Sequence, residues 1–204
     1  MSVAAVVLAA GGSARFGKPK QFALFEGETF VRRIVRAAIE AGCAPVVVVT
    51  GADSAQITSE LTRFTVTIAM NPGWSSGVGS SIRVGVQRAM DLEADLDASL
   101  LLSCDQPFVT VAVLAQLIQL RLTSGKPIIA SAYATTLGIP ALFDRSCFPD
   151  LLRLKEDSGA KKIILARPHD VASFDFPGGE IDIDTAADYE KLDQPLAADG
   201  TRLG

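Results

Sequence analysis

Residues 3–20 read Val-Ala-Ala-Val-Val-Leu-Ala-Ala-Gly-Gly-Ser-Ala-Arg-Phe-Gly-Lys-Pro-Lys, and this stretch determines the expected fold. Residues 3–9 form an apolar run rich in β-branched side chains, which is typical of a strand buried on both faces of a parallel sheet. The run leads directly into Gly11 and Gly12, so a glycine loop follows the strand. Because parallel sheets bind ligands at the carboxyl ends of their strands, this loop is the first place to expect a site.

Apolar strands alternate with amphipathic helices along the rest of the chain. Strands are expected at residues 45–50, 66–70, 98–103, 126–133, 170–175 and 180–183. Helices are expected at residues 28–41, 54–63, 80–90, 110–122, 159–166 and 186–192, whereas residues 142–154 have no clear pattern. This alternation, without an internal repeat, predicts a three-layer α/β/α sandwich with a Rossmann-like, mostly parallel sheet.

Composition limits the classes of protein that fit. The chain has 204 residues, of which 49% are hydrophobic, and its formal net charge is −4. This length predicts a single domain, expected at residues 1–193, with residues 194–204 as a frayed tail. A mean hydropathy of +0.31 excludes intrinsic disorder, and a sequence pI of about 5.0 disfavours binding to nucleic acid.

The amino terminus and the cysteines give no sign of export. The apolar start is short and lacks a basic flank, so it is interpreted as a buried strand and not as a signal peptide or membrane span. The three cysteines form no C-x-x-C pair, and we expect reduced thiols in a cytoplasmic protein, with Cys104 in the core. His169 is the only histidine, so a zinc site lacks ligands.

The loop at residues 10–20 combines three glycines with the cations Arg15, Lys18 and Lys20. Glycine lets backbone N–H groups converge on an anion, and the cations supply the charge that a polyphosphate requires. A tight surface turn with solvated cations is the alternative. Pro19 stands where a P-loop needs Ser or Thr, and the dinucleotide spacing G-x-G-x-x-G is absent from this loop, so neither of those motifs explains it.

Acidic residues follow two of the expected strands. Asp105 comes just after strand 98–103, where an unpaired carboxylate in the ligand crevice is costly unless it binds a cation. Asp182 and Asp184 share one face of an expected strand, which favours a divalent cation between or near them. A turn or cap role for Asp105, and a helix cap formed by Asp184 or Thr185, are the alternatives.

The loop at residues 71–81 is rich in glycine and serine and precedes a helix. Ser80 and Ser81 could contact a ribose or a base through their hydroxyls or through the amides at the helix start. Ordinary capping of the helix explains these two serines equally well.

Together these segments resemble the nucleotidyltransferase family that includes MobA and MocA of molybdenum cofactor synthesis. The similar motifs are Leu8–Lys20, Ser76–Ile82, Leu101–Pro107, Gly138–Phe143, Asp157–Ile164 and Asp182–Asp188. Ala9-Ala10-Gly11 and the Asp-Ile-Asp-Thr stretch resemble the CTP-using MocA group more than the GTP-using MobA group. Ile139 is a departure, because the family often has His between the Gly and Pro of its Gly-x-Pro motif.

The resemblance implies a fold of the nucleotide-diphospho-sugar transferase type and a Mg²⁺-dependent reaction. In that reaction an NMP group moves from an NTP, expected to be CTP, to a phosphorylated acceptor, expected to be molybdopterin or its molybdenum form, with release of pyrophosphate. The implied catalytic residues are Arg15, Lys20 and Asp105, and the implied metal ligands are Asp105 with Asp182 or Asp184. The implied nucleotide-binding residues are Ala9, Ala10, Gly11, Gly12, Ser13, Arg15, Lys20, Ser80 and Ser81.

Other functions remain compatible with these motifs. They are a GTP-dependent molybdopterin guanylyltransferase, a sugar- or alditol-phosphate cytidylyltransferase, and a chaperone that carries molybdenum cofactor to a molybdenum hydroxylase. Lys20 and Asp105 argue against the chaperone, because a pure carrier needs neither an NTP loop nor a metal-binding aspartate. Partners of the nucleic-acid or membrane class are not expected.

Overall fold

A seven-stranded sheet forms the centre of the computed structural model, which describes residues 1–11, 19–181 and 189. The strand order is β5-β4-β1-β6-β8-β7-β9. Their bounds are β1 (Val3–Ala9), β4 (Val46–Thr50), β5 (Thr67–Met70), β6 (Ala98–Ser103), β7 (Ile128–Tyr133), β8 (Thr136–Asp144) and β9 (Val171–Asp175). Only β8 runs antiparallel to its neighbours in this described sheet, so the predicted mostly parallel sheet is confirmed.

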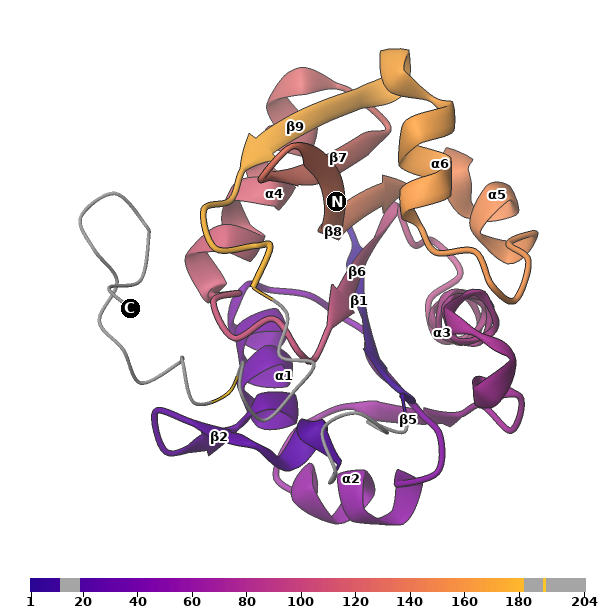
Figure 1. Cartoon of the computed structure of the whole chain (residues 1–204). Coiled ribbons are helices and arrows are strands. Elements are labelled where there is room, and N and C mark those ends of the chain that lie inside the picture. Colours follow the sequence, from indigo (N-terminus) through magenta and orange to yellow (C-terminus); the bar gives the residue numbers. More distant parts are fainter. Residues whose placement is uncertain (12–18, 182–188, 190–204) are drawn as a thin grey trace.

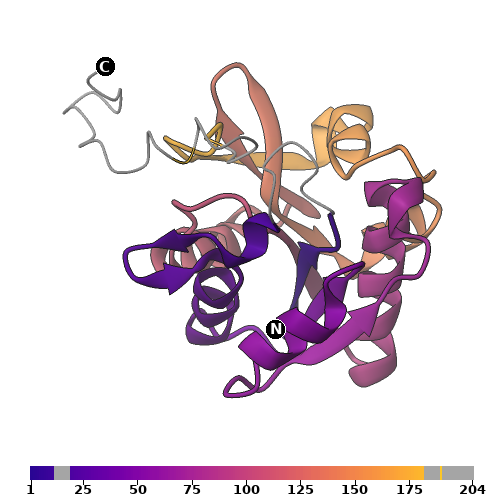
Figure 2. The same cartoon turned by 60° about the horizontal axis from the view of Figure 1, so that its bottom comes forward.

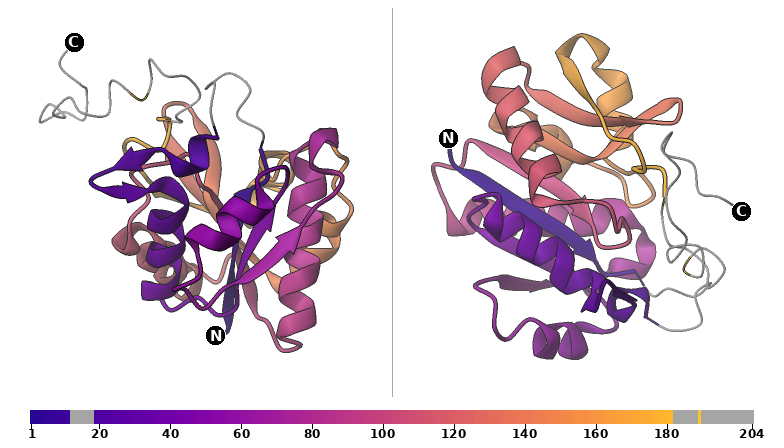
Figure 3. Two further views of the ribbon diagram at one scale, coloured as in Figure 1. Left: turned by 90° about the horizontal axis from the view of Figure 1, so that it is seen from below. Right: turned by 90° about the vertical axis from the view of Figure 1, so that its left-hand side faces the viewer.

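Helices cover both faces of the sheet (Figures 1 and 3). One layer contains α1 (Phe30–Glu40), α2 (Ser54–Glu60) and α4 (Val111–Ser124), and the other contains α3 (Val78–Leu92), α5 (Phe148–Leu152) and α6 (Lys161–Ala166). Side chains of β1 alternate between the two cores: Val7 packs in the core with α1, and Val6 packs in the core with α3. The predicted three-layer sandwich is therefore confirmed.

A small hairpin of β2 (Leu24–Phe25) and β3 (Glu28–Thr29) lies beside α1 (Figure 2). The sequence pattern predicts a helix from Glu28, but Glu28 pairs with Phe25 and the helix begins two residues later. The guanidinium of Arg33 lies 4.8 Å from the centroid of the Phe25 ring, so a cation–π contact joins the hairpin to α1.

Two parts of the carboxyl-terminal half differ from the prediction. Residues 142–154 have no clear sequence pattern, but they contain α5 and the end of β8. β8 was not predicted, and it pairs with β6 and β7 in the central sheet. Glu180 and Ile181 lie in and after a turn instead of a strand, because Gly179 donates to the carbonyl of Phe176 and Ile181 to that of Gly178. The predicted helix 186–192 lies outside the described residues, apart from residue 189.

In the part of the chain that the structure describes, no helix combines the length and the apolar character that crossing a bilayer requires.

Candidate active site

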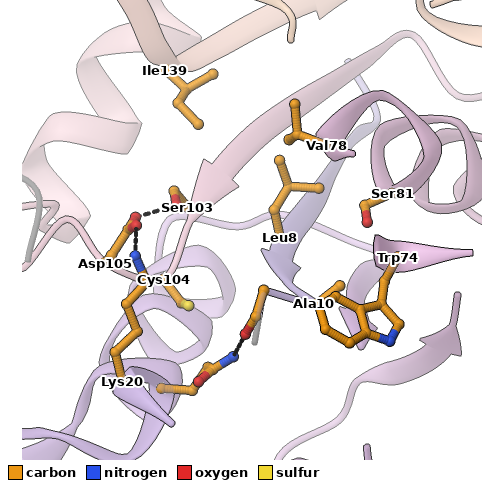
Figure 4. A pocket seen from close by; sticks show the side chains of 12 residues that line it. Leu8, Ala10, Lys20, Trp74, Val78, Ser81, Ser103, Cys104, Asp105 and Ile139 are labelled. Carbon is orange, nitrogen blue, oxygen red and sulfur yellow. Dashed lines mark hydrogen bonds and ion pairs between the residues drawn. The ribbon is translucent and has the colours of Figure 1, made fainter. Parts of the chain in front are cut away.

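A cavity of about 230 Å³ opens at the carboxyl ends of β1 and β6 (Figure 4). These strands are parallel neighbours with Leu8 opposite Ser103, so the loops that follow them meet at the same edge. The cavity is lined by Leu8, Ala10, Gly11, Lys20, Gln21, Trp74, Val78, Ser81, Ser103, Cys104, Asp105 and Ile139. The loops predicted at residues 10–20 and 71–81 contribute residues to this lining, as does Asp105, which was predicted to follow a buried strand.

An ion pair forms one side of the cavity. Lys20 Nζ lies 2.5 Å from Asp105 Oδ2, and the hydroxyl of Ser103 donates to Oδ1 of the same carboxylate (Figure 4). Each charged side chain is only 15% exposed. Partial removal from water strengthens such a pair relative to a surface ion pair. Lys20, which the sequence predicts to bind phosphate, and Asp105, which it predicts to bind a metal, are therefore in direct contact.

Gln21 braces the first loop from inside the protein. Its side chain is buried, and Nε2 donates to the carbonyl of Ala9 at 3.1 Å and to that of Gly11 at 2.7 Å. These bonds join the residue after Lys20 to the end of β1 and to Gly11. Sequence reasoning missed Gln21, because an isolated polar residue carries no periodic signal.

Trp74 and Ser81 lie on the opposite side of the cavity from the ion pair, next to Ala10 (Figure 4). The Trp74 indole packs closely on Gly51: a Cβ added at Gly51 would meet Trp74 Cγ at 2.7 Å and the carbonyl oxygen of Ala10 at 2.4 Å. Only glycine at position 51 therefore allows the indole to lie against the ends of β1 and β4. Trp74 is a second lining residue that sequence reasoning missed.

The two serines of the middle loop have different surroundings. Asn71 Nδ2 donates to Ser80 Oγ at 2.8 Å and to Ser81 Oγ at 3.0 Å. Ser80 Oγ also lies 2.8 Å from the carbonyl of Gly77, and Ser80 is absent from the cavity lining, so its hydroxyl serves to hold the loop. Ser81 lines the cavity and stays the better candidate for a ligand contact.

A loop at residues 154–158 holds the amino-terminal end of α3 in place. Gly79 donates to the carbonyl of Glu156 at 2.9 Å, and Arg83 donates to the carbonyl of Leu154 and pairs with the Glu156 carboxylate at 2.9 Å. A Cβ at Gly79 would lie 1.9 Å from the carbonyl oxygen of Lys155. The close backbone approach fixes the helix turn that carries the lining residues Val78 and Ser81.

Replacing Gly79 with Ala is expected to lower the free energy of unfolding by about 1–3 kcal/mol, because the added methyl group overlaps a backbone carbonyl that cannot turn away. Urea denaturation of the purified variant measures this change. The matched control is Gly159→Ala, whose Cβ would lie 3.6 Å from Val78 Cγ1, an ordinary contact. Equal stability of the two variants would contradict the close packing inferred at Gly79.

Cys104 lies beside the ion pair but belongs to the core, as predicted. Burial, with a smaller contribution from the neighbouring Asp105 carboxylate, raises the pKa of its thiol to about 12. The thiol is therefore protonated and uncharged at neutral pH, and it is not a nucleophile.

The remaining predicted site residues fall into two groups. Ala10 and Gly11 line the cavity, whereas Ala9 is buried in the core with its carbonyl taken by Gln21. The others lie outside the described residues and stay predictions: Gly12, Ser13, Arg15, Lys18, Asp182 and Asp184.

The donor set around Asp105 suits a hard divalent cation. Carboxylate and hydroxyl oxygens are the ligands that Mg²⁺ and Mn²⁺ prefer, and Mg²⁺ is commonly held by one or two carboxylates with water and substrate phosphates. Asp105 and Ser103 supply such oxygens. Within residues 1–11, 19–181 and 189, no group of three or more His, Cys, Asp or Glu side chains forms a metal cluster.

A family model described as the MobA-like NTP transferase domain matches residues 5–171. The chain belongs to this family. The predicted resemblance is therefore confirmed, and the chain is a nucleotidyltransferase of the MobA/MocA type. The match includes the glycine loop, the ion pair and the loop at residues 71–81.

The chain is similar to two named proteins, one of which has been solved in two structures. The chain is 29% identical over 178 residues to nicotine blue oxidoreductase of Paenarthrobacter nicotinovorans, covering 81% of this chain and 83% of that protein. Rv0371c from Mycobacterium tuberculosis H37Rv is 27% identical, with a TM-score of 0.81 and coverage of 94% and 97%. Its complex with manganese gives 26% identity, a TM-score of 0.76 and coverage of 94% and 98%.

A more distant structure shares only the fold. Molybdopterin-guanine dinucleotide biosynthesis protein A from Archaeoglobus fulgidus is 17% identical, with a TM-score of 0.67 over 94% of this chain and 96% of that one.

Proposed function

We propose that the protein transfers a nucleoside monophosphate from an NTP to a phosphorylated acceptor and releases pyrophosphate. CTP is the proposed donor, and molybdopterin or its molybdenum form is the proposed acceptor. The observation that supports this proposal is the contact between Lys20 and Asp105 in a cavity at the carboxyl ends of β1 and β6. It combines a cation for phosphate oxygens with a carboxylate for a divalent metal.

The chemistry requires alignment and charge neutralisation. An acceptor phosphate attacks the α-phosphorus of the NTP, the bond to the β-phosphate oxygen breaks, and pyrophosphate leaves. The acceptor needs no general base, because the second pKa of a phosphate monoester is about 6, so it is largely ionised at neutral pH. This agrees with a lining composed of a cation, a carboxylate, hydroxyls, the Gln21 amide, the Cys104 thiol and apolar side chains.

Each described residue then has a distinct role. Lys20 neutralises oxygens of the leaving pyrophosphate, and in doing so it transfers its contact from Asp105 to the phosphates. Asp105, freed from Lys20 and still bonded to Ser103, holds Mg²⁺ together with Asp182 or Asp184. A bound Mg²⁺ supplies charge neutralisation at the phosphoryl oxygens.

The two other sides of the cavity suit the nucleoside and the acceptor. Trp74 offers an aromatic face beside Ala10 and Ser81, where a nucleobase can pack. Leu8, Val78 and Ile139 form an apolar wall, which we assign to the acceptor. Ile139 replaces a histidine frequent in the family, and the apolar wall therefore favours an acceptor that presents a planar or apolar surface next to its phosphate.

One relative suggests a second candidate function. Because the chain is 29% identical over 178 residues to nicotine blue oxidoreductase, an oxidoreductase reaction on nicotine blue is the main rival to nucleotidyl transfer. An oxidoreductase needs a bound reductant and no pyrophosphate chemistry, so oxidation of NADH or NADPH in the presence of that substrate distinguishes the two candidates.

The decisive experiment measures pyrophosphate release with Mg²⁺, each of the four NTPs in turn, and molybdopterin, its molybdenum form or a panel of sugar and alditol phosphates. Trp74 is the only tryptophan, so its fluorescence reports nucleotide binding in the same samples. Release with CTP and molybdopterin supports the proposal. Release with GTP instead of CTP overturns the proposed donor. Release only with a sugar phosphate overturns the proposed acceptor. Cofactor binding without release from any NTP favours the chaperone.

A further inference from the structure

Gln106, the residue after Asp105, has a buried side chain that contacts two separate segments. It is 6% exposed, and Nε2 donates to the carbonyl of Ile139 and to that of Gly179, each at 3.0 Å. Both partners are carbonyl oxygens, which only accept, so the amide must turn its nitrogen toward them. Oε1 has no hydrogen-bond partner among the described residues, as expected for that orientation.

The first segment is a bulge in β8. Register between β7 and β8 shifts from Ala130 opposite Ala141 to Ser131 opposite Gly138, which leaves Ile139 and Pro140 as extra residues. Ser131 Oγ donates to the carbonyl of Pro140 at 2.7 Å. Bulges redirect side chains next to functional sites, and here the bulge directs Ile139 into the apolar wall (Figure 4).

The second segment is the turn at residues 176–181. Phe176 is buried and donates from its backbone to the carbonyl of Ala132 at 2.9 Å, and Gly179 donates to the carbonyl of Phe176 at 3.0 Å. The turn therefore follows β9 directly and is bonded to β7 at its start. In the sequence it is followed at once by Asp182 and Asp184.

We infer that Gln106 is a positioning residue that ties the Asp105 loop to the Ile139 bulge and the Gly179 turn, and so fixes the spacing between Asp105 and the apolar wall. This inference rests on the proposed nucleotidyl transfer. Reacting groups must lie about 3–3.5 Å apart, and a displacement of about 1 Å costs roughly a hundredfold in rate. The nucleotide side of the cavity, formed by Trp74 and Ser81, makes no bond to Gln106 within the described residues.

The test variant is Gln106→Met, which keeps the length of the side chain and removes both N–H donors. We expect kcat/KM for the acceptor to fall by roughly 10- to 100-fold, whereas the Kd for the NTP, measured by Trp74 fluorescence, changes less than about twofold. Amide exchange followed by NMR should become faster at Val109, Gly179 and Ile181, whose amides are bonded within the two loops.

The matched control is Ser131→Ala, which removes a buried hydrogen bond to the same bulge but leaves the bonds of Gln106. Equal loss of acceptor kcat/KM in both variants, or an unchanged acceptor kcat/KM in Gln106→Met, would overturn the positioning role. If the wild type releases no pyrophosphate with any NTP and acceptor, the proposed function fails, and amide exchange alone tests the inference. Faster exchange in Gln106→Met then supports a role of Gln106 in holding the Asp105 loop against the Ile139 bulge and the Gly179 turn, and unchanged exchange overturns it.

Discussion

Pyrophosphate release by Asp105→Asn is expected to be slower than that of the wild type by a factor on the order of 10³, because the variant loses the only negative charge in the described cavity lining. Asparagine keeps the shape of the side chain and can still accept the bond from Ser103, so the local packing is retained. The amide binds a divalent cation much more weakly than a carboxylate does. The loss should therefore appear in kcat and in Mn²⁺ affinity together.

The measurement pairs steady-state kinetics at saturating CTP with a titration of Mn²⁺ followed by electron paramagnetic resonance. Asp91→Asn is the control, because Asp91 is an exposed aspartate near the far end of α3 and is not part of the cavity lining. Wild-type turnover in Asp105→Asn would exclude Asp105 from the metal site. Wild-type Mn²⁺ affinity with reduced turnover would restrict its role to holding Lys20.

The second large expected effect is the loss of NTP affinity and turnover when the positive charge of Lys20 is removed. Lys20→Ala is expected to raise the KM for the NTP by roughly 10- to 100-fold and to lower kcat by about 10²-fold, because the phosphates lose a partly buried positive charge as pyrophosphate leaves. The preference for NTP over NMP should shrink as well, since Lys20 is assigned to the β- and γ-phosphates. An arginine at position 20 should not restore activity fully, because its planar head differs in shape.

Fluorescence titration of Trp74 with CTP and CMP measures that preference directly. Lys126→Ala is a suitable control, because Lys126 is exposed next to the amino end of β7, and its amine is bonded to the carbonyl of His169. Parallel weakening of CTP and CMP binding in Lys20→Ala would indicate general damage to the cavity and contradict a phosphate-specific role. A melting temperature close to that of the wild type would show that the fold is intact.

Much of the architecture could be predicted because buried strands and helices have characteristic patterns of apolar residues in the sequence. β1 is apolar at every position and β6 at four of its six positions, which is typical of strands covered on both faces. The helix expected at residues 110–122 is present as α4, and the hydroxyl of Thr110 caps it by accepting from the backbone of Val113. The position of Asp105 after a buried strand was enough to predict a carboxylate in the crevice.

The remaining features depend on contacts between distant residues. Lys20 and Asp105 are 85 positions apart, so their ion pair follows from the adjacency of β1 and β6 and not from spacing in the sequence. Gln21 and Gln106 are single polar residues whose roles exist only through the carbonyls that they meet. β8 was missed because Gly138 and Pro140 interrupt its pattern, and the bulge is what accommodates the proline.

The antiparallel direction of β8 has a consequence for how specificity can change. β7 and β8 form a hairpin whose turn, Ala134-Thr135, lies at the carboxyl edge of the sheet, whereas the ion pair and Trp74 belong to other elements. Ile139, one of the three residues proposed to contact the acceptor, comes from this hairpin, whereas none of the residues proposed to contact the nucleotide does. A graft of this hairpin from a relative should therefore change the preference among acceptors and leave the Kd for the NTP nearly unchanged, so this part of acceptor specificity can evolve without loss of nucleotide binding.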